Sequence, residues 1–409
     1  MYSSNQRPQR LENRTMAETI AQNIEKSNSD FSHTKKRLVS IDALRGFVMV
    51  IMLIDHIRET FYLHIQVSGP VDVYVTSPAL FYTRFASAIC APVFIFMTGL
   101  SAALYSQKHS KNATAGFLLK RGLFLVFLEV TLIVFLWTFK YPPDMFYLQV
   151  IWCIGLCMIA LAVLIYFPPR ALLLIGLLIV VGHNLIDGFK LDPQSPFIIP
   201  WAILYQREVL DIGGLVARTS YPVLPWVGVI LLGFVTGPWF FNNYPALQRQ
   251  KRLLTLGLMG LLLFLMIRSL NFYGDYPWIN TGEISKTIMS FLSLTKYPPS
   301  FMFNLLMLSL GLLLLVLFEK FQNHNFTKIM SQFGAAPMFY YILHLALLRI
   351  LYVISYSIYG PTHGKYVSFP SVGYIWLTFV ILTVLLYFPT KWFSVFKQRN
   401  RHISWLKYF

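Results

Sequence analysis

Charged side chains are scarce in this sequence of 409 residues, of which 12% are charged and 56% hydrophobic. A soluble globular chain carries about 25% charged residues, and the mean hydropathy of +0.57 points away from that class. Apolar runs of about 20 residues recur between short polar loops, as they do in helical membrane proteins. The sequence therefore predicts an all-α, polytopic integral membrane helix bundle.

Cysteine is rare too, and Cys90, Cys153 and Cys157 all lie inside apolar segments. Their spacing gives no disulfide framework and no zinc site. Cys153 and Cys157 are one helical turn apart on the same helix face, which favours a packing role for both. A Walker-type loop, a dinucleotide fingerprint, a GxSxG elbow and an HExxH motif are all missing from the sequence. These absences argue against P-loop ATP hydrolysis, hydride transfer and zinc proteolysis, and we expect no metal.

Ten segments are expected to span the membrane. They are residues 39–62, 80–105, 117–139, 145–166, 171–188, 223–241, 253–271, 299–318, 334–358 and 371–389. Residues 1–37 are polar and lack the apolar core of a signal peptide, so we expect a flexible cytosolic tail. Residues 38–390 are then the transmembrane domain, and residues 391–409 are a basic cytosolic C-terminal tail.

Lysine and arginine set the expected orientation. When residues 35–37 are placed in the cytosol, 22 of the 34 basic residues fall on the inner side and seven in outer loops. This asymmetry follows the positive-inside rule and places both termini in the cytosol. The basic excess therefore predicts contact with anionic membrane lipid and no nucleic-acid partner. The oligomeric state is left open, with a homodimer as one candidate.

The first span carries a line of polar side chains. Residues that share one face, at about 100° of rotation per residue, are Asp42, Arg45, Met49, Met52 and His56. His56 follows Arg45 by eleven residues, or about 16 Å along a helix, which is half the thickness of a hydrocarbon core. For Asp42 and Arg45 alone, capping the helix and anchoring it at the interface explains the pair as well as a functional role does. His56 lies too far along the helix for that explanation.

Further ionisable residues lie within the apolar segments, most of them toward the outer side. They are Arg58, Glu59, Arg84, Glu129, His183, Asp187, Arg268, His344 and Arg349. Such residues face a bundle interior or a wet cavity, which predicts a cavity lined by several spans and open to the outside. A histidine there suits a general base or a nucleophile, and arginines suit an anionic group. The alternative for each residue is an ion pair, a structural hydrogen bond or an interfacial anchor.

The outer loops are long and aromatic, as in "PFIIPWAILYQRE" and "NFYGDYPWINTGE". Aromatic and acidic side chains suit a sugar acceptor, although Trp and Tyr also gather at membrane interfaces. The segments "KYPPDMFYLQ" and "KYPPSFMFNL" each open a span from the outer side. They are explained either by an ancestral duplication of the kind seen in transporters or by chance recurrence of a proline-rich helix start.

Six blocks of sequence together resemble the bacterial branch of the heparan-alpha-glucosaminide N-acetyltransferase-like family. They are "RLVSIDALRGFVMVIMLIDH", "CAPVFIFMTGLS", "YPVLPWVGVILLGFVTG", "LNFYGDYPW", "KYPPSFMFNL" and "FGAAPMFYYILHLALLR". The resemblance implies a multi-pass acyltransferase of the bacterial inner membrane. It implies acetyl-CoA as co-substrate, bound from the cytosol, and an extracytoplasmic amino sugar, glycan or glycolipid as acceptor.

The resemblance also implies a catalytic histidine just after the first span. His56 stands where lysosomal members have an asparagine, and their histidine falls in the following loop, where His64 is the nearest candidate. We favour His56 over His64. The donor coenzyme A is polyanionic, and the residues expected to bind it are Asp42, Arg45, Lys120 and Arg121. The residues expected to bind the acceptor are Arg58, Arg84, Arg268, Asp275 and His344.

A transporter or flippase for a lipid-linked or anionic solute is the rival interpretation. It is favoured by the two "KYPP" segments and the embedded charges. Transporters of this kind use broken helices at the membrane midplane, and the sequence offers few candidates for them. We therefore expect an acyltransferase in preference to a transporter.

Overall fold

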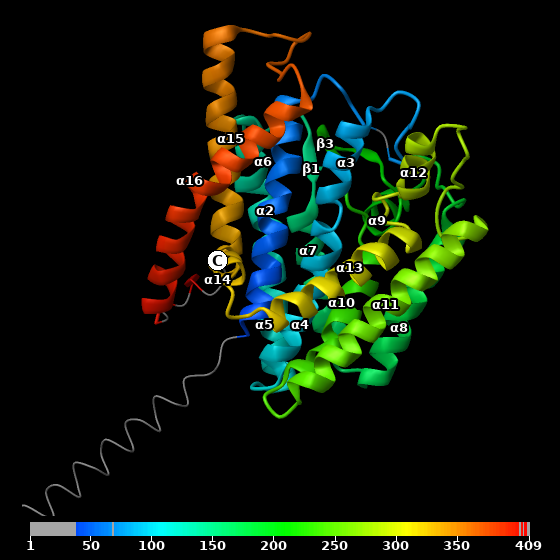
Figure 1. The fold of residues 1–409 in the computed structure, drawn as a ribbon, viewed down its shortest axis with the longest axis vertical. Coiled ribbons are helices and arrows are strands. Elements are labelled where there is room, and N and C mark those ends of the chain that lie inside the picture. Colours follow the sequence, from blue (N-terminus) through cyan, green and yellow to red (C-terminus); the bar gives the residue numbers. More distant parts are fainter. Residues whose placement is uncertain (1–37, 68, 401, 404, 407–409) are drawn as a thin grey trace, which may run out of the picture. The chain divides into compact units, whose positions relative to one another are not determined.

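The computed structural model describes residues 38–67, 69–400, 402–403 and 405–406, and most of these residues are helical (Figure 1). The expected N-terminal tail, residues 1–37, lies outside the described residues. The last helix, α16 (Val372–Arg399), continues into the segment expected to be the C-terminal tail.

Six helical segments of the described residues are long and apolar enough to cross a membrane. They are α3 with α4 (Pro78–Ser87 and Cys90–Ser106), α8 with η2 (Pro169–Gly182 and His183–Ile186), α11 (Ala246–Leu270), α13 (Phe301–Lys320), α15 (Pro337–Tyr359) and α16. Shorter apolar helices are α7 (Val150–Leu164) and α10 with η3 (Leu224–Thr236 and Gly237–Phe240). The expected class, a helical membrane protein, is confirmed. The total of ten spans and the side on which the termini lie stay predictions.

Two further helical segments occupy the remaining expected spans. One is α2 (Val39–Phe61), and the other is α5 (Lys111–Leu128), continued by a π-helical turn η1 (Glu129–Ile133) and α6 (Val134–Thr138). Charged residues in α2 lower its hydropathy. Helix α2 packs against α3, α4, α13, α15, α16 and the short helix α14 (Asn325–Ala335). In Figure 1 it runs between the α15–α16 pair and the α3–α7 side of the bundle.

A three-stranded sheet departs from the all-helical expectation. Strand β1 (Phe146–Leu148) pairs in parallel with β3 (Leu215–Thr219), which pairs antiparallel with β2 (Val209–Ile212). The helix predicted from residue 145 therefore begins only at Val150. Gly213 and Gly214 have φ of 61° and 89°, as the two-residue turn between β2 and β3 requires. Two short helices, α9 (Ile198–Leu204) and α12 (Ile284–Leu292), also lie between the expected spans.

Glycines bring α2 and α14 into close contact. A Cβ added to Gly46 would lie 1.8 Å from the carbonyl oxygen of Met330, and one added to Gly334 would lie 1.8 Å from that of Asp42. Small residues at such crossings let the two backbones touch. The contact fixes the N-terminal half of α2, where Arg45 lies.

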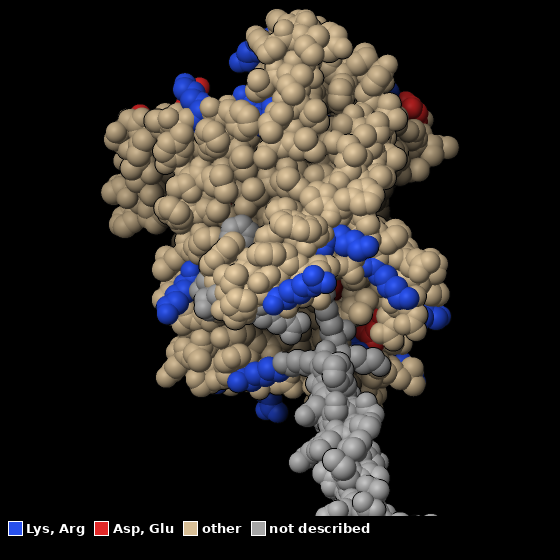
Figure 2. Space-filling view, turned by 90° about the vertical axis from the view of Figure 1, so that its left-hand side faces the viewer, with Lys and Arg blue, Asp and Glu red and all other residues tan. Residues whose placement is uncertain are grey.

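One face of the molecule is banded by charge. In Figure 2, Lys and Arg side chains gather toward one end and a few lie at the other, with an almost uncharged band between them. Many large apolar side chains of α8, α11 and α16 are exposed, among them Leu178, Leu262 and Val384. An apolar belt between charged rims is what a membrane-embedded surface requires.

Candidate functional site

The side chains singled out in α2 line a cavity of about 1000 Å³. Arg45, Met49, Met52 and His56 all lie on its wall, as their shared helical face predicts. The rest of the lining comes from α3, α4, α5, α6, α7 and α15, from β1 and β3, and from the loops after α2, α9, α12 and α15. We name the two ends of this central cavity the Arg45 end and the Arg58 end. The predicted cavity lined by several spans is therefore present.

A pair of buried histidines lies between these ends. His56 Nδ1 is 2.7 Å from His344 Nε2, and His344 Nδ1 is 2.7 Å from the carbonyl oxygen of Tyr340. His344 is fully buried, whereas His56 reaches the cavity. Trp137 and Tyr341 present their rings to His56 at 5.2 and 5.8 Å. The two histidines come from the first and ninth expected spans.

The carbonyl of Tyr340 determines the arrangement of protons in this pair. A carbonyl only accepts, so His344 must donate from Nδ1, and its Nε2 then accepts in the neutral ring. His56 must therefore donate from Nδ1, which leaves the lone pair on His56 Nε2. Because the ring of His56 lines the cavity, that nitrogen is available to accept a proton from a bound molecule. The arrangement matches an oriented general base or nucleophile.

The Arg45 end is built from α2, α4, α5 and α14. Arg45 donates to Asp42 (3.0 Å), to Ser101 (2.9 Å) and to the carbonyl of Gly334 (3.3 Å). Arg121 also lies on the cavity wall. These two guanidinium groups can receive anionic groups such as phosphates. Lys120 is exposed outside the lining.

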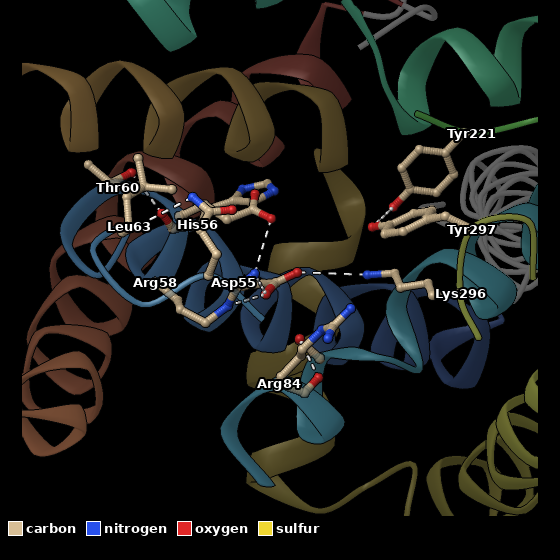
Figure 3. A network of polar contacts seen from close by, with 12 residues as sticks. Asp55, His56, Arg58, Thr60, Leu63, Arg84, Tyr221, Lys296 and Tyr297 are labelled. Atoms are coloured by element: carbon tan, nitrogen blue, oxygen red, sulfur yellow. Dashed lines mark hydrogen bonds and ion pairs between the residues drawn. The ribbon is translucent and has the colours of Figure 1, made fainter. Parts of the chain in front are cut away.

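Asp55 is the centre of an ion-pair network at the Arg58 end (Figure 3). Arg58 donates to it at 2.8 and 3.0 Å, and Lys296 approaches from the other side at 3.7 Å. Arg58 also pairs with Glu59 at 3.1 Å. Arg84 lies beside this network on the cavity wall. Arg58 and Arg84 were expected to bind the acceptor here, whereas Asp55 and Lys296 were not among the expected site residues.

Lys296 belongs to the second "KYPP" segment, whose tyrosine also lines the cavity. The hydroxyl groups of Tyr297 and Tyr221 are 3.1 Å apart. Burial alone lowers the pKa of Lys296, but the neighbouring Tyr297 and Asp55 outweigh burial and raise that pKa above its ordinary value. Lys296 is therefore a permanent cation at neutral pH. The repeated motif was a signal for this segment, although nothing local indicated that Asp55 is the partner of Lys296.

Two of the expected acceptor residues lie behind the cavity wall. Arg268 donates to the carbonyls of Phe291, Tyr276, Ser290 and Ser293 at 2.7 to 3.2 Å. Asp275 accepts from the backbone and hydroxyl of Thr295 and from the hydroxyl of Ser300. Both residues therefore hold the segment that presents Lys296 and Tyr297. Neither is brought to the cavity lining.

The remaining candidates are dispersed. His64 lies outside the cavity lining, stacked on His363 at 4.3 Å and edge-on to Tyr62 at 4.5 Å, and burial and His363 lower its pKa. His183 contacts the carbonyls of Ile179 and Pro299 at 2.8 and 2.7 Å. Glu129 accepts from the backbone of Trp152 at 3.2 Å. Only Arg349 of the dispersed residues lines the cavity, and it donates to the carbonyl of Thr138 at 2.8 Å.

A helical membrane protein with a histidine pair in a cationic cavity fits the class of membrane-embedded transferases. Residues 37–275 match the model for the catalytic domain of heparan-alpha-glucosaminide N-acetyltransferase. The match covers more than half of the 409 residues, so the chain belongs to this acetyltransferase family. No curated protein matches the chain. His56 lies inside the matched range, whereas Lys296 and His344 lie beyond it.

Proposed function

We propose that this protein is a transmembrane acyltransferase that moves an acetyl group from cytosolic acetyl-CoA to an extracytoplasmic amino sugar, glycan or glycolipid. The observation that carries the proposal is the His56–His344 pair, 2.7 Å apart and open to the central cavity through His56. Membership of an acetyltransferase family supports the same conclusion. The cellular site that we propose is the bacterial inner membrane.

The Arg45 end is the proposed entrance for the donor. Arg45 and Arg121 would hold the phosphates of acetyl-CoA, with Asp42 fixing the guanidinium of Arg45 at 3.0 Å. The cavity of about 1000 Å³ is at the upper end of the range for small-molecule sites, and Met49 and Met52 offer an apolar path for the pantetheine arm. The bound donor supplies an activated thioester.

The Arg58 end is the proposed acceptor site. His56 Nε2 accepts the proton of the acceptor amine or hydroxyl, while His56 Nδ1 keeps its own proton and donates it in the hydrogen bond to His344 Nε2. The imidazolium that results is stabilised by that hydrogen bond and returns its proton to the departing thiolate. Trp137 and Tyr341 exclude water from the ring of His56. Arg58 and Arg84 face the acceptor from the cavity wall.

Release of coenzyme A by the purified protein tests this proposal. In detergent, with acetyl-CoA and glucosamine, free thiol should appear in step with N-acetylglucosamine. Loss of a general base costs about 10²- to 10⁴-fold in rate, so we expect His56→Ala to lower kcat by that much. His402→Ala, an exposed histidine, is the matched control.

Two other results would reassign the function. Loss of activity in His64→Ala with activity kept in His56→Ala would move the base to the outer loop. Solute counterflow in proteoliposomes without acetyl-CoA, together with no acetyl transfer, would favour the transporter. The break between α3 and α4 at residues 88–89 would then be the candidate for the broken helix that transporters use at their binding site.

A further inference from the structure

The charges on the cavity wall are unbalanced. Eight cationic side chains line it against two carboxylates, Asp55 and Glu59. Both carboxylates are paired with Arg58, and Asp55 also with Lys296. The cavity therefore carries a surplus of positive charge beyond what its own acids neutralise. Such a surplus attracts an anionic ligand.

Part of this surplus is held on the β2–β3 hairpin. Arg218 lies in β3 opposite Val209 of β2, and Arg207 lies two residues before Val209. Arg207 therefore precedes the strand and Arg218 lies within the hairpin, and both arginines line the cavity. Burial and the charge of Arg218 lower the pKa of Arg207. The two cations are therefore near enough for the charge of Arg218 to act on Arg207.

Among the described residues, the acidic side chains of the hairpin form hydrogen bonds with groups other than Arg207 and Arg218. Glu208 accepts from Gln206 at 2.9 Å, and Asp211 accepts from the backbone of Gly214 in the turn. Arg207 instead lies over the ring of Tyr297 at 5.3 Å. Tyr297 follows Lys296 in the sequence, and Lys296 pairs with Asp55. Asp55 is the residue before His56. A short chain of contacts thus joins the arginine pair to the histidine.

We propose that Arg207 and Arg218 form an anion-binding subsite at the Arg58 end of the cavity, which takes a carboxylate or phosphate carried by the acceptor. The inference rests on the proposed acetyl transfer and makes the acceptor an acidic amino sugar or glycan. Two adjacent guanidinium groups offer bidentate hydrogen bonds to either anion. A bound anion removes the repulsion between them.

Acceptor preference tests the subsite with three amino sugars that differ in one group. Glucosamine is the reference, glucosamine 6-phosphate carries the phosphate and muramic acid carries the carboxylate. We expect the wild type to prefer one of the acidic sugars in kcat/KM. Each charged contact removed should cost about 10- to 100-fold, so Arg207→Gln and Arg218→Gln should each lower that preference ratio by this factor.

Matched variants separate charge from folding. Arg207→Lys and Arg218→Lys keep the charge and should retain more of the preference than the glutamine variants. Lys190→Gln removes an exposed outer-loop cation outside the cavity and should keep the whole ratio. Raised salt should also shrink the preference. Equal use of all three sugars by the wild type, or an unchanged ratio in both glutamine variants, would overturn the subsite.

Equilibrium binding distinguishes failure of the subsite from failure of the acetyl transfer. If the wild type transfers no acetyl group, calorimetry with glucosamine 6-phosphate, muramic acid and glucosamine on the detergent-solubilised protein replaces the kinetic ratio. Tighter binding of an acidic sugar, weakened about 10- to 100-fold in the glutamine variants, would support the subsite alone. Equal binding of the three sugars would overturn it.

Discussion

The carbonyl of Tyr340 controls the chemistry of a nitrogen two rings away. It fixes the proton on His344, which in turn fixes the proton on His56 and leaves His56 Nε2 toward the cavity. In the proposed mechanism His344 is therefore a positioning residue for His56. This role differs from the contact with the acceptor that the sequence suggested for His344, which stays a prediction.

Replacement of His344 should lower turnover more than substrate binding. In His344→Ala, His56 loses the acceptor for its Nδ1 proton and its orientation, so we expect kcat to fall about 100-fold or more with a small change in KM. His344→Gln keeps an acceptor and should recover part of the rate. Steady-state release of coenzyme A measures both variants. Equal loss in the two variants, or a change confined to KM, would contradict a positioning role.

Asp275 should matter for stability although it lies behind the wall. It accepts three hydrogen bonds from Thr295 and Ser300, and an amide nitrogen at this position would face a donor. We expect Asp275→Asn to lower the free energy of unfolding by about 2 kcal/mol, seen as a lower melting temperature in detergent. Asp144→Asn, with its side chain 85% exposed, is the control. A melting temperature unchanged from the wild type would refute the structural role.

At the scale of elements, the crossing of α2 and α14 determines where Arg45 lies. Gly334 contributes both the close approach and the carbonyl that receives Arg45 at 3.3 Å. The packing of α2 against α14 therefore also determines the geometry of the Arg45 end. The segments that carry Lys296 and the β2–β3 hairpin provide the opposite end.

A methyl group at this crossing should be poorly tolerated. Gly46→Ala places a Cβ 1.8 Å from the carbonyl oxygen of Met330, so the helices must separate, at a cost of roughly 1 to 3 kcal/mol. Gly116→Ala is the matched control, because a Cβ there meets nothing within 4 Å. Thermal unfolding monitored by size-exclusion chromatography compares the two variants. Equal melting temperatures would show that the helices are not in contact as described.

At the scale of the whole molecule, the proposed function assigns the donor to one end of the cavity and the acceptor to the other, so it requires a defined orientation. From the positive-inside asymmetry we expect the Arg45 end on the cytosolic side. The three native cysteines are buried, so we expect them to react little with a maleimide. Lys190 and Lys111 are exposed positions on opposite expected sides.

Cysteine labelling in intact cells should confirm this orientation. Lys190→Cys should react with a membrane-impermeant maleimide, whereas Lys111→Cys should react only after the membrane is permeabilised. The measurement is a shift in gel mobility with a polyethylene-glycol maleimide. Labelling of Lys111→Cys in intact cells would reverse the assignment of donor and acceptor sides.

The parts of the site carried by one helix were predictable from the sequence. Arg45, Met49, Met52 and His56 follow from helical periodicity, and a lone histidine in an apolar segment stands out by its cost. Pairings between distant segments were not predictable in this way, because His344 and Lys296 are brought to α2 by tertiary packing. Strand β1 was also not predictable from the sequence, because a short apolar run fits either a strand or a helix.

The distance in sequence between the members of each pair also has a consequence for biosynthesis. His344 follows His56 by 288 positions, so at about 5 to 20 residues per second α2 leaves the ribosome roughly 15 to 60 s before its partner helix. Until the downstream segments are made, Asp55 has no Lys296, Arg45 has no Gly334 carbonyl and His56 has no His344. Because unpaired charges are costly in a bilayer, we expect the first helix to stay in the insertion machinery or in contact with lipid headgroups until the later helices are made.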